Sequence, residues 1–182
     1  MRASPPSLLP EGEEEQLSIA SIHKHFVFSG LTISYLLKNI IMPDIRHLVS
    51  LKSTPEKIYR AISTQTGIAS WWSRDNNAKP EKGSVYRISF GGDYYKEIKI
   101  TELVTDSKVV WEILQAHPEW LNTKVSFDIS MGKNSTELRF SHSGWKDYTD
   151  MFAQCSYHWA IYLGNLKAYV EKDQLFALST FF

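Results

Sequence analysis

Histidine is the residue type in this 182-residue chain that most readily does chemistry near neutral pH. The six histidines are His23, His25, His47, His117, His142 and His158. None of them forms an HExxH pair or a His/Asp group with metal-site spacing, so we expect no metal and no cofactor. His142 lies in phase with Leu138 and Phe140 and is expected to face the interior. There it is either a satisfied, partly buried polar group, which is the favoured interpretation, or a group that orients a ligand or acts as acid or base. His158 could approach the same space and is a second candidate.

The remaining reactive groups favour structural roles. The lone cysteine, Cys155, excludes an internal disulfide, and its place on an apolar helix face predicts a core residue rather than a nucleophile. Glu112 and Asp128 alternate with apolar neighbours and are interpreted as solvated carboxylates on a sheet face. No carboxylate dyad is indicated, so catalysis stays undecided, and a protein without demanding chemistry is the favoured interpretation.

Aromatic residues are more informative than these ionisable residues, since tryptophan and tyrosine commonly line sites for apolar ligands. We expect a ligand-binding set made of Trp71, Trp72, Tyr86, Phe90, Trp111, Phe127, Phe140, His142, Trp145, Trp159 and Tyr162. Three of these, Trp71, Trp72 and Trp145, lie outside the predicted strands, where the mouth of a cavity would be. For any single aromatic residue, however, ordinary core packing is the favoured interpretation.

Composition limits the classes of partner. Hydrophobic residues make up 43% of the chain, enough for a real core, and the formal net charge is zero, with 20 basic and 20 acidic residues. No cluster of lysine or arginine exceeds two adjacent residues, which argues against nucleic acid or an anionic membrane surface as the main partner. The chain has one cysteine and no secretory signal pattern, so we expect a cytoplasmic setting.

The first forty residues differ in character from the rest. Residues 1–22 are rich in proline, serine and glutamate and are expected to be disordered. Residues 26–41 are apolar, but they fall short of the roughly 20 residues that span a membrane, and Lys38 interrupts them. This stretch is a membrane span, a helix laid on the domain, or non-native sequence upstream of a misassigned start at Met42. We expect a domain over 42–173 after an extension over 1–41, and a loose tail over 174–182.

A regular pattern begins after Met42. Alternation predicts strands over 44–52, 84–90, 94–104, 108–114, 123–130 and 136–142. A helix begins at Ser53 or Thr54, with either residue as the N-cap, and a second short helix carries Ile68, Trp71 and Trp72. Residues 73–83 are polar and form a loop, and Gly91-Gly92-Asp93 signals a hairpin.

The element that must organise these strands is a long helix over 149–172. One of its faces is apolar at steps of three and four residues: Phe152, Cys155, Trp159, Leu163, Leu166 and Val170. Thr149 is the expected N-cap. The order of elements predicts an α+β fold in which a bent antiparallel sheet wraps around this helix.

Residues 42–172 resemble the START-like superfamily, in the branch named after the activator of the heat-shock protein 90 ATPase. The matching stretches are STPEKIYRAISTQTGIASWWS, TELRFSHSGW and HWAIYLGNLKAYVEK. The resemblance implies a helix-grip fold with an elongated cavity between the sheet and the C-terminal helix, where many members bind hydrophobic small molecules. Some relatives are cyclases, aromatases or hydrolases. The co-chaperones that give the branch its name use an additional N-terminal domain, which residues 1–41 do not resemble.

Three functions therefore remain open. The favoured one is a domain that binds a small hydrophobic ligand in the cavity. The alternatives are a co-chaperone-like protein-interaction module and a cyclase- or hydrolase-type enzyme that uses the same cavity. An enzyme would require two convergent ionisable groups within hydrogen-bonding reach, with shifted pKa values.

Overall fold

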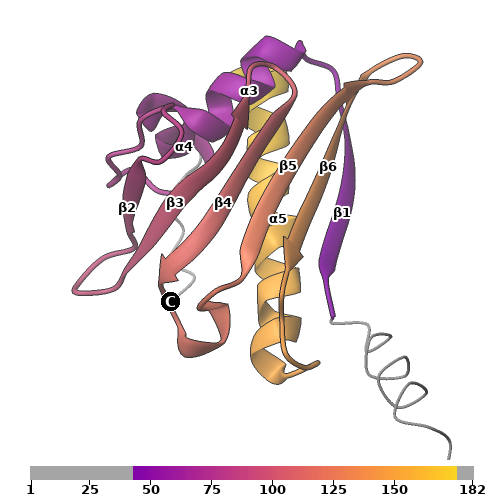
Figure 1. Cartoon of the computed structure of the whole chain (residues 1–182). Helices are drawn as coiled ribbons and strands as arrows, with labels where there is room; N and C mark the ends of the chain where they lie inside the picture. The colour runs from indigo at the N-terminus through magenta and orange to yellow at the C-terminus, as the bar shows by residue number, and fades with distance from the viewer. Residues whose placement is uncertain (1–42, 176–182) are drawn as a thin grey trace, which may run out of the picture. The chain divides into compact units, whose positions relative to one another are not determined.

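The computed structural model describes residues 43–175. Its elements in chain order are β1 (Ile45–Leu51), α3 (Pro55–Ser63), α4 (Gln65–Trp71), β2 (Val85–Ser89), β3 (Tyr95–Val104), β4 (Lys108–Gln115), η1 (Pro118–Trp120), β5 (Lys124–Met131), β6 (Thr136–Ser143) and α5 (Asp150–Lys172). The predicted order of one strand, two helices, five strands and a long helix is confirmed, and a short 3-10 helix, η1, is added (Figure 1). The expectations for residues 1–41 and for the tail beyond residue 175 lie outside the described residues.

The six strands form one antiparallel sheet in the order β1-β6-β5-β4-β3-β2. Strands β2 to β6 are a meander, and β1 joins the far side of β6, with Ile45 opposite His142. The register of β3 against β4 shifts between Ile100 and Glu102, and such irregularities increase the local twist of a sheet. The curved sheet lies across α5 in Figure 1, which confirms the predicted α+β helix-grip fold.

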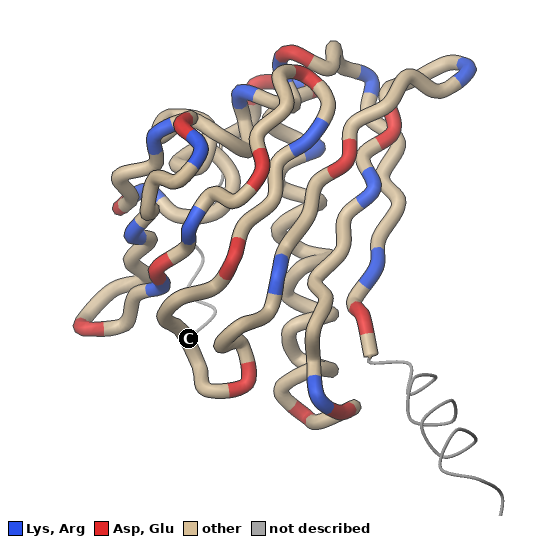
Figure 2. Tube along the Cα trace, in the orientation of Figure 1, with Lys and Arg blue, Asp and Glu red and all other residues tan. Residues whose placement is uncertain are grey.

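The two faces of the sheet differ as the alternation predicts. Phe127 on β5 and Leu138 on β6 are fully buried, whereas the residues beside them face outward. On the outer face, the Lys108 ammonium lies 3.2 Å from the Glu102 carboxylate and 3.8 Å from that of Asp128. Figure 2 shows basic and acidic residues interspersed along the strands. Such partly exposed pairs contribute little to stability, and the concave face therefore carries most of it.

Helices α3 and α4 close one end of the sheet. Thr54 is the N-cap of α3, because its hydroxyl accepts a hydrogen bond from the Lys57 amide at 3.2 Å, and this settles the choice between Ser53 and Thr54. Gly67 lets α4 approach α3 closely, since a Cβ at this position would lie 2.2 Å from the Arg60 carbonyl oxygen. This close approach brings the tryptophan pair at the end of α4 under the sheet.

Helix α5 presents its apolar face to the concave side of the sheet. The predicted face is confirmed at its five buried positions, Cys155, Trp159, Leu163, Leu166 and Val170, whereas Phe152 is half-buried. Thr149 is the N-cap, as predicted, and accepts from the Phe152 amide at 3.1 Å. Asp173 ends the helix in the left-handed conformation, and its carboxylate lies 2.8 Å from the Lys57 ammonium of α3. The caps thus fix both the length of α5 and its attachment to α3.

The stability of the fold should depend on this face of α5. Leu163 is 2% exposed, so Leu163→Ala removes buried apolar atoms and leaves a void. We expect the free energy of unfolding, measured with urea, to fall by about 2–5 kcal/mol. Leu175→Ala, at a position that is 64% exposed, is the matched control and should change it by less than about 0.5 kcal/mol. Equal effects of the two variants would show that the face is misassigned.

Candidate functional site

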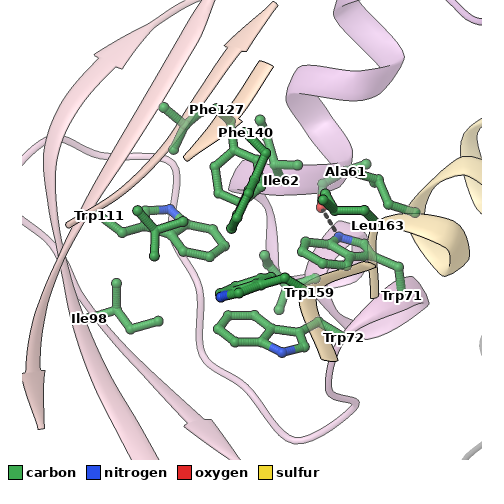
Figure 3. Close-up of a cluster of buried hydrophobic side chains, with 14 of the residues drawn as sticks. Ala61, Ile62, Trp71, Trp72, Ile98, Trp111, Phe127, Phe140, Trp159 and Leu163 are labelled. Carbon is green, nitrogen blue, oxygen red and sulfur yellow. Dashed lines mark hydrogen bonds between the residues drawn. The ribbon is translucent and has the colours of Figure 1, made fainter. Parts of the chain in front are cut away.

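The space between the sheet and α5 is largely filled by stacked aromatic rings (Figure 3). The centroid of the Trp72 ring lies 5.3 Å from that of Trp111 on β4 and 5.3 Å from that of Trp159 on α5. Trp71 stacks on Trp72 at 5.8 Å, and its indole N–H donates to the Ala61 carbonyl oxygen at 2.9 Å. Trp72 therefore joins the sheet to the helix at the centre of the domain.

Next to this packed region lies a cavity of about 460 Å³, here called the α5 cavity. Its walls come from the end of α4, the β2–β3 hairpin, β3, the η1 segment and the N-terminal half of α5. The lining residues are Trp72, Phe90, Tyr94, Lys96, His117, Trp120, Met151, Gln154, Cys155, His158, Trp159 and Tyr162. Exposed residues, among them Tyr94 and Gln154, form its rim. The volume falls within the range of small-molecule sites.

A lysine lies in the wall of this cavity. Lys96 is only 6% exposed, because it occupies an inward position of β3 together with Ile98 and Ile100. Its ammonium donates a hydrogen bond to the Tyr94 hydroxyl at 2.6 Å. The same nitrogen lies 4.3 Å from the ring centroid of Phe90, 4.4 Å from that of Tyr94 and 4.7 Å from that of Trp120. These distances are those of cation–π contacts, which hold a buried ammonium without neutralising it.

The hairpin between β2 and β3 builds this aromatic cage. Gly91 and Gly92 have φ angles of 97° and 54°, and they make the tight turn that returns the chain toward β2. As a result, the Phe90 amide donates to the Tyr94 carbonyl oxygen at 3.0 Å, and the two rings lie 5.9 Å apart. Both rings then reach the ammonium of Lys96. Burial lowers the pKa of Lys96 to about 8.

The thiol of Cys155 is part of the same wall and is not activated. It is 4% exposed and accepts a hydrogen bond from the Trp120 indole N–H at 2.9 Å. Burial raises its pKa to about 11, although the contact with Trp120 and the charge of Lys96 act in the opposite direction. The thiol is therefore protonated at neutral pH, in agreement with its predicted role as a core residue.

His142 is fully buried behind the cavity and both of its ring nitrogens are engaged. The Trp159 indole N–H donates to Nδ1 at 3.1 Å, and Nε2 lies 2.8 Å from the Thr123 hydroxyl. The indole can only donate, so the neutral ring must carry its proton on Nε2 and donate it to Thr123. The Thr123 hydroxyl donates in turn to the Trp120 carbonyl oxygen at 2.6 Å. Of the roles left open for His142, the geometry matches the satisfied polar group, and its burial is complete rather than partial.

The structure divides the eleven residues of the expected ligand-binding set. Trp72, Phe90, Trp159 and Tyr162 line the α5 cavity. The other seven lie outside its lining, in the packed core: Trp71, Tyr86, Trp111, Phe127, Phe140, His142 and Trp145. The placement of Trp71 and Trp145 at a cavity mouth is wrong, since they are 0% and 1% exposed. Their rings pack against other aromatic side chains, which removes them from solvent. As ligand contacts, the four lining residues remain predictions.

Sequence reasoning missed several lining residues, above all Lys96. Its signal is nevertheless in the sequence, because Lys96 is in phase with Ile98 and Ile100 on one face of β3. Trp120 lies in the short helix η1, and the sequence around it has no periodic pattern that would indicate its inward position. His117 and His158, in contrast, belong to the histidines considered at the outset, and both line the cavity.

The pair of Lys96 and Tyr94 meets the geometric condition for two convergent ionisable groups. Burial raises the pKa of Tyr94 and lowers that of Lys96 to about 8. At neutral pH both groups are therefore mainly protonated, and both carry hydrogen-bond donors. Such a pair is suited to holding an acceptor rather than to removing a proton. Within residues 43–175, no three His, Cys, Asp or Glu side chains are close enough to hold a metal ion.

Comparison with known families now adds to this geometry. Residues 52–171 match the model of the family described as Activator of Hsp90 ATPase homolog 1-like protein. The chain belongs to this family. The resemblance seen in the sequence is thereby confirmed, with its START-like helix-grip fold. No curated protein matches the chain.

Solved structures agree with the family assignment. The Aha1 dimer from Colwellia psychrerythraea is 35% identical with a TM-score of 0.67, and the match covers 72% of this chain and 98% of that one. A protein from Mesorhizobium loti is 21% identical with a TM-score of 0.61, covering 69% and 94%. An AHSA1-like protein from Aeromonas hydrophila is 14% identical with a TM-score of 0.58, covering 70% and 92%. The last two show the fold alone.

Membrane insertion can be judged for the helices between residues 43 and 175. None of them combines the length and the apolar character that crossing a membrane requires.

The burial of His142 leads to a testable pH dependence. Burial, and next the charge of Lys96, lower the pKa of His142 from 6.5 to about 3. Between these values the unfolded chain binds a proton that the native protein does not, so stability falls as the pH falls below 6.5. We expect this group to remove about 1.4 kcal/mol of unfolding free energy per pH unit.

Urea unfolding at a series of pH values and ¹H–¹⁵N NMR of the imidazoles would measure these effects. In the His142→Gln variant, the change in unfolding free energy per pH unit should be smaller by the contribution of one bound proton. His158→Gln, at a half-buried position, is the control. An imidazole signal of His142 that titrates near pH 6.5, or that shows the proton on Nδ1, would contradict the proposed network.

Proposed function

We propose that this chain is a START-like domain that binds a small hydrophobic molecule in the α5 cavity. The observation that carries the proposal is a cavity of about 460 Å³ whose walls are mainly aromatic, between the sheet and the C-terminal helix. A ligand there would contact Trp72, Trp159 and Tyr162. The driving force would be removal of apolar surface from water, at about 25 cal/mol per Å².

The cavity is a local feature of an otherwise well-filled interior. Trp71, Trp111 and Phe127 are completely buried and occupy the adjoining core with rings in contact. Loose packing of the whole domain therefore does not account for the space. Its rim, in contrast, carries the partly exposed Tyr94 and the exposed Gln154. A packed floor and an exposed rim are features that a ligand-binding cavity requires.

Ligand binding can be followed through the tryptophans of the wall. We expect a panel of small apolar and aromatic compounds to include members that change tryptophan fluorescence and raise the melting temperature. Saturation at about 100 times Kd corresponds to about 2.7 kcal/mol of added stability.

A blocking variant provides the control. Gln154→Trp places a large side chain at the rim and should weaken binding at least about tenfold, since it occupies ligand space. Ala160→Trp adds the same ring to α5 at an exposed position outside the cavity lining and should leave binding unchanged. Absence of any response across the panel in the wild-type protein would refute the proposed function.

Protein interaction is a second candidate, favoured by the comparisons. The name of the family refers to an activator of the Hsp90 ATPase, and the relative from Colwellia psychrerythraea is described as a dimer. On this chain, Tyr148, just before α5, is 72% exposed, and Tyr157, in the N-terminal half of α5, is 64% exposed. Exposed tyrosines are frequent at protein interfaces.

For this second candidate we expect the chain to sediment as a dimer or to stimulate the Hsp90 ATPase. The Tyr157→Ser variant should weaken dimer formation or ATPase stimulation, whichever the wild-type protein shows. Thr101→Ser, on β3, serves as the control. A monomeric chain that leaves the ATPase rate unchanged would remove this candidate. Neither result bears on the fluorescence response of the α5 cavity, so the two candidates are tested separately.

A further inference from the structure

The charge balance of the α5 cavity indicates what kind of ligand it takes. Twelve described residues line the cavity, and neither aspartate nor glutamate is among them. Lys96 is the lysine in this lining, and within residues 43–175 it has no salt-bridge partner. Buried charges in proteins are normally paired, so a lysine in an apolar wall without an anion is unusual.

The other titratable groups that face Lys96 do not supply the missing negative charge. Burial raises the pKa values of Tyr94, Tyr162 and Cys155, which are therefore uncharged at neutral pH. His117 and His158 also line the cavity, and a histidine is neutral or positive in either protonation state. The residues that line the cavity thus carry the positive charge of Lys96 and no carboxylate. The Glu119 carboxylate on η1, which acts on Cys155, lies outside this lining and accepts a hydrogen bond from the Thr149 hydroxyl.

The ammonium also retains hydrogen-bonding capacity. A lysine has three N–H donors, and one of those of Lys96 is directed to the Tyr94 hydroxyl. The rings of Phe90, Tyr94 and Trp120 hold the cation from several sides, but π faces do not accept hydrogen bonds as strongly as an oxygen does. An acceptor from a ligand would complete the coordination of the ammonium.

We propose that the ligand of the α5 cavity is a small apolar monoanion, a carboxylic acid whose carboxylate pairs with Lys96. This inference rests on the proposed ligand-binding function and specifies the chemical class of the ligand. The apolar body of the acid lies against Trp72, Trp159 and Tyr162, and the carboxylate accepts a charge-assisted hydrogen bond from the ammonium. A single lysine without an arginine in the lining suits one carboxylate better than a phosphate, which usually engages several donors.

The experiment compares acids with amides of the same shape. The probes are 2-naphthoate and 2-naphthamide, and octanoate and octanamide, with dissociation constants measured by calorimetry and tryptophan fluorescence. Each amide keeps the apolar body and a carbonyl acceptor but lacks the charge. We expect each acid to bind the wild-type protein about tenfold or more tightly than its amide, the effect of one charge-assisted hydrogen bond in a buried site.

Two lysine variants locate the effect. Lys96→Met should abolish the preference for the acids, whereas the amides should still bind, because the methionine keeps the apolar wall. Lys99→Met is the matched control, since Lys99 is exposed on the opposite face of the same strand. A melting curve of each variant verifies folding, and Lys96→Met should melt at or above the wild-type temperature because it removes a buried charge that has no salt-bridge partner among residues 43–175.

The wild-type protein provides a test that needs no variant. The affinity for 2-naphthoate should fall as the pH rises above about 8, where the ammonium of the unliganded protein loses its proton, while the affinity for 2-naphthamide stays constant. Cys155 remains protonated in this range, since its pKa is about 11, and the raised pKa values of Tyr94 and Tyr162 keep both hydroxyls neutral.

The outcomes separate this inference from the proposed function. Equal binding of acids and amides by the wild-type protein would overturn the monoanion inference and leave hydrophobic binding in place. An acid preference that survives in Lys96→Met would overturn the role of Lys96. A failure of all four probes in the wild-type protein, together with the wider panel of apolar compounds, would overturn the proposed function itself.

Discussion

The burial of one face of α5 against the concave side of the sheet is the interaction on which the rest of this domain depends. Five residues of that face are buried, and Trp159 among them contacts Trp72 and Phe140 with ring centroids 5.3 Å and 4.6 Å away. A curved sheet cannot close its own apolar side, so without the helix these rings would remain in water. The position of α5 also sets where the interior is filled and where it is open.

The open part is lined by residues of both α5 and the β2–β3 hairpin, and there the chain buries a lysine. Removing an ammonium from water destabilises a fold unless an anion accompanies it. Within residues 43–175, Lys96 has aromatic rings and one tyrosine hydroxyl around it instead, and burial lowers its pKa to about 8. His142 presents the opposite case, because its two ring nitrogens are fully engaged by Trp159 and Thr123. Of these two buried bases, Lys96 at the cavity retains hydrogen-bonding capacity, whereas His142 in the core does not.

The separation of the interior into a filled core and a cavity explains why a list of aromatic residues contains more residues than the binding site. Trp71, Trp111 and Phe127 contact one another or Trp72 and are shielded from solvent, so they form the floor behind the cavity wall. Trp72 and Trp159 belong to both, since each packs against the core on one side and lines the cavity on the other. Membership of the Activator of Hsp90 ATPase homolog 1-like family is consistent with either a ligand or a protein partner.

The sequence by itself determined the elements, because local chemistry decides them. Alternation placed the strands, the steps of three and four residues placed the buried face of α5, and Thr149 marked its first turn. The alternation along β3 also indicated that Lys96 faces inward, as Ile98 and Ile100 do. Only the tertiary structure decided which aromatic rings fill the core and which line the α5 cavity. That depends on where α5 and the β2–β3 hairpin lie relative to each other, and on Trp120 of η1, which contacts Lys96 and Cys155. Such contacts join residues far apart in the chain, and no periodicity records them.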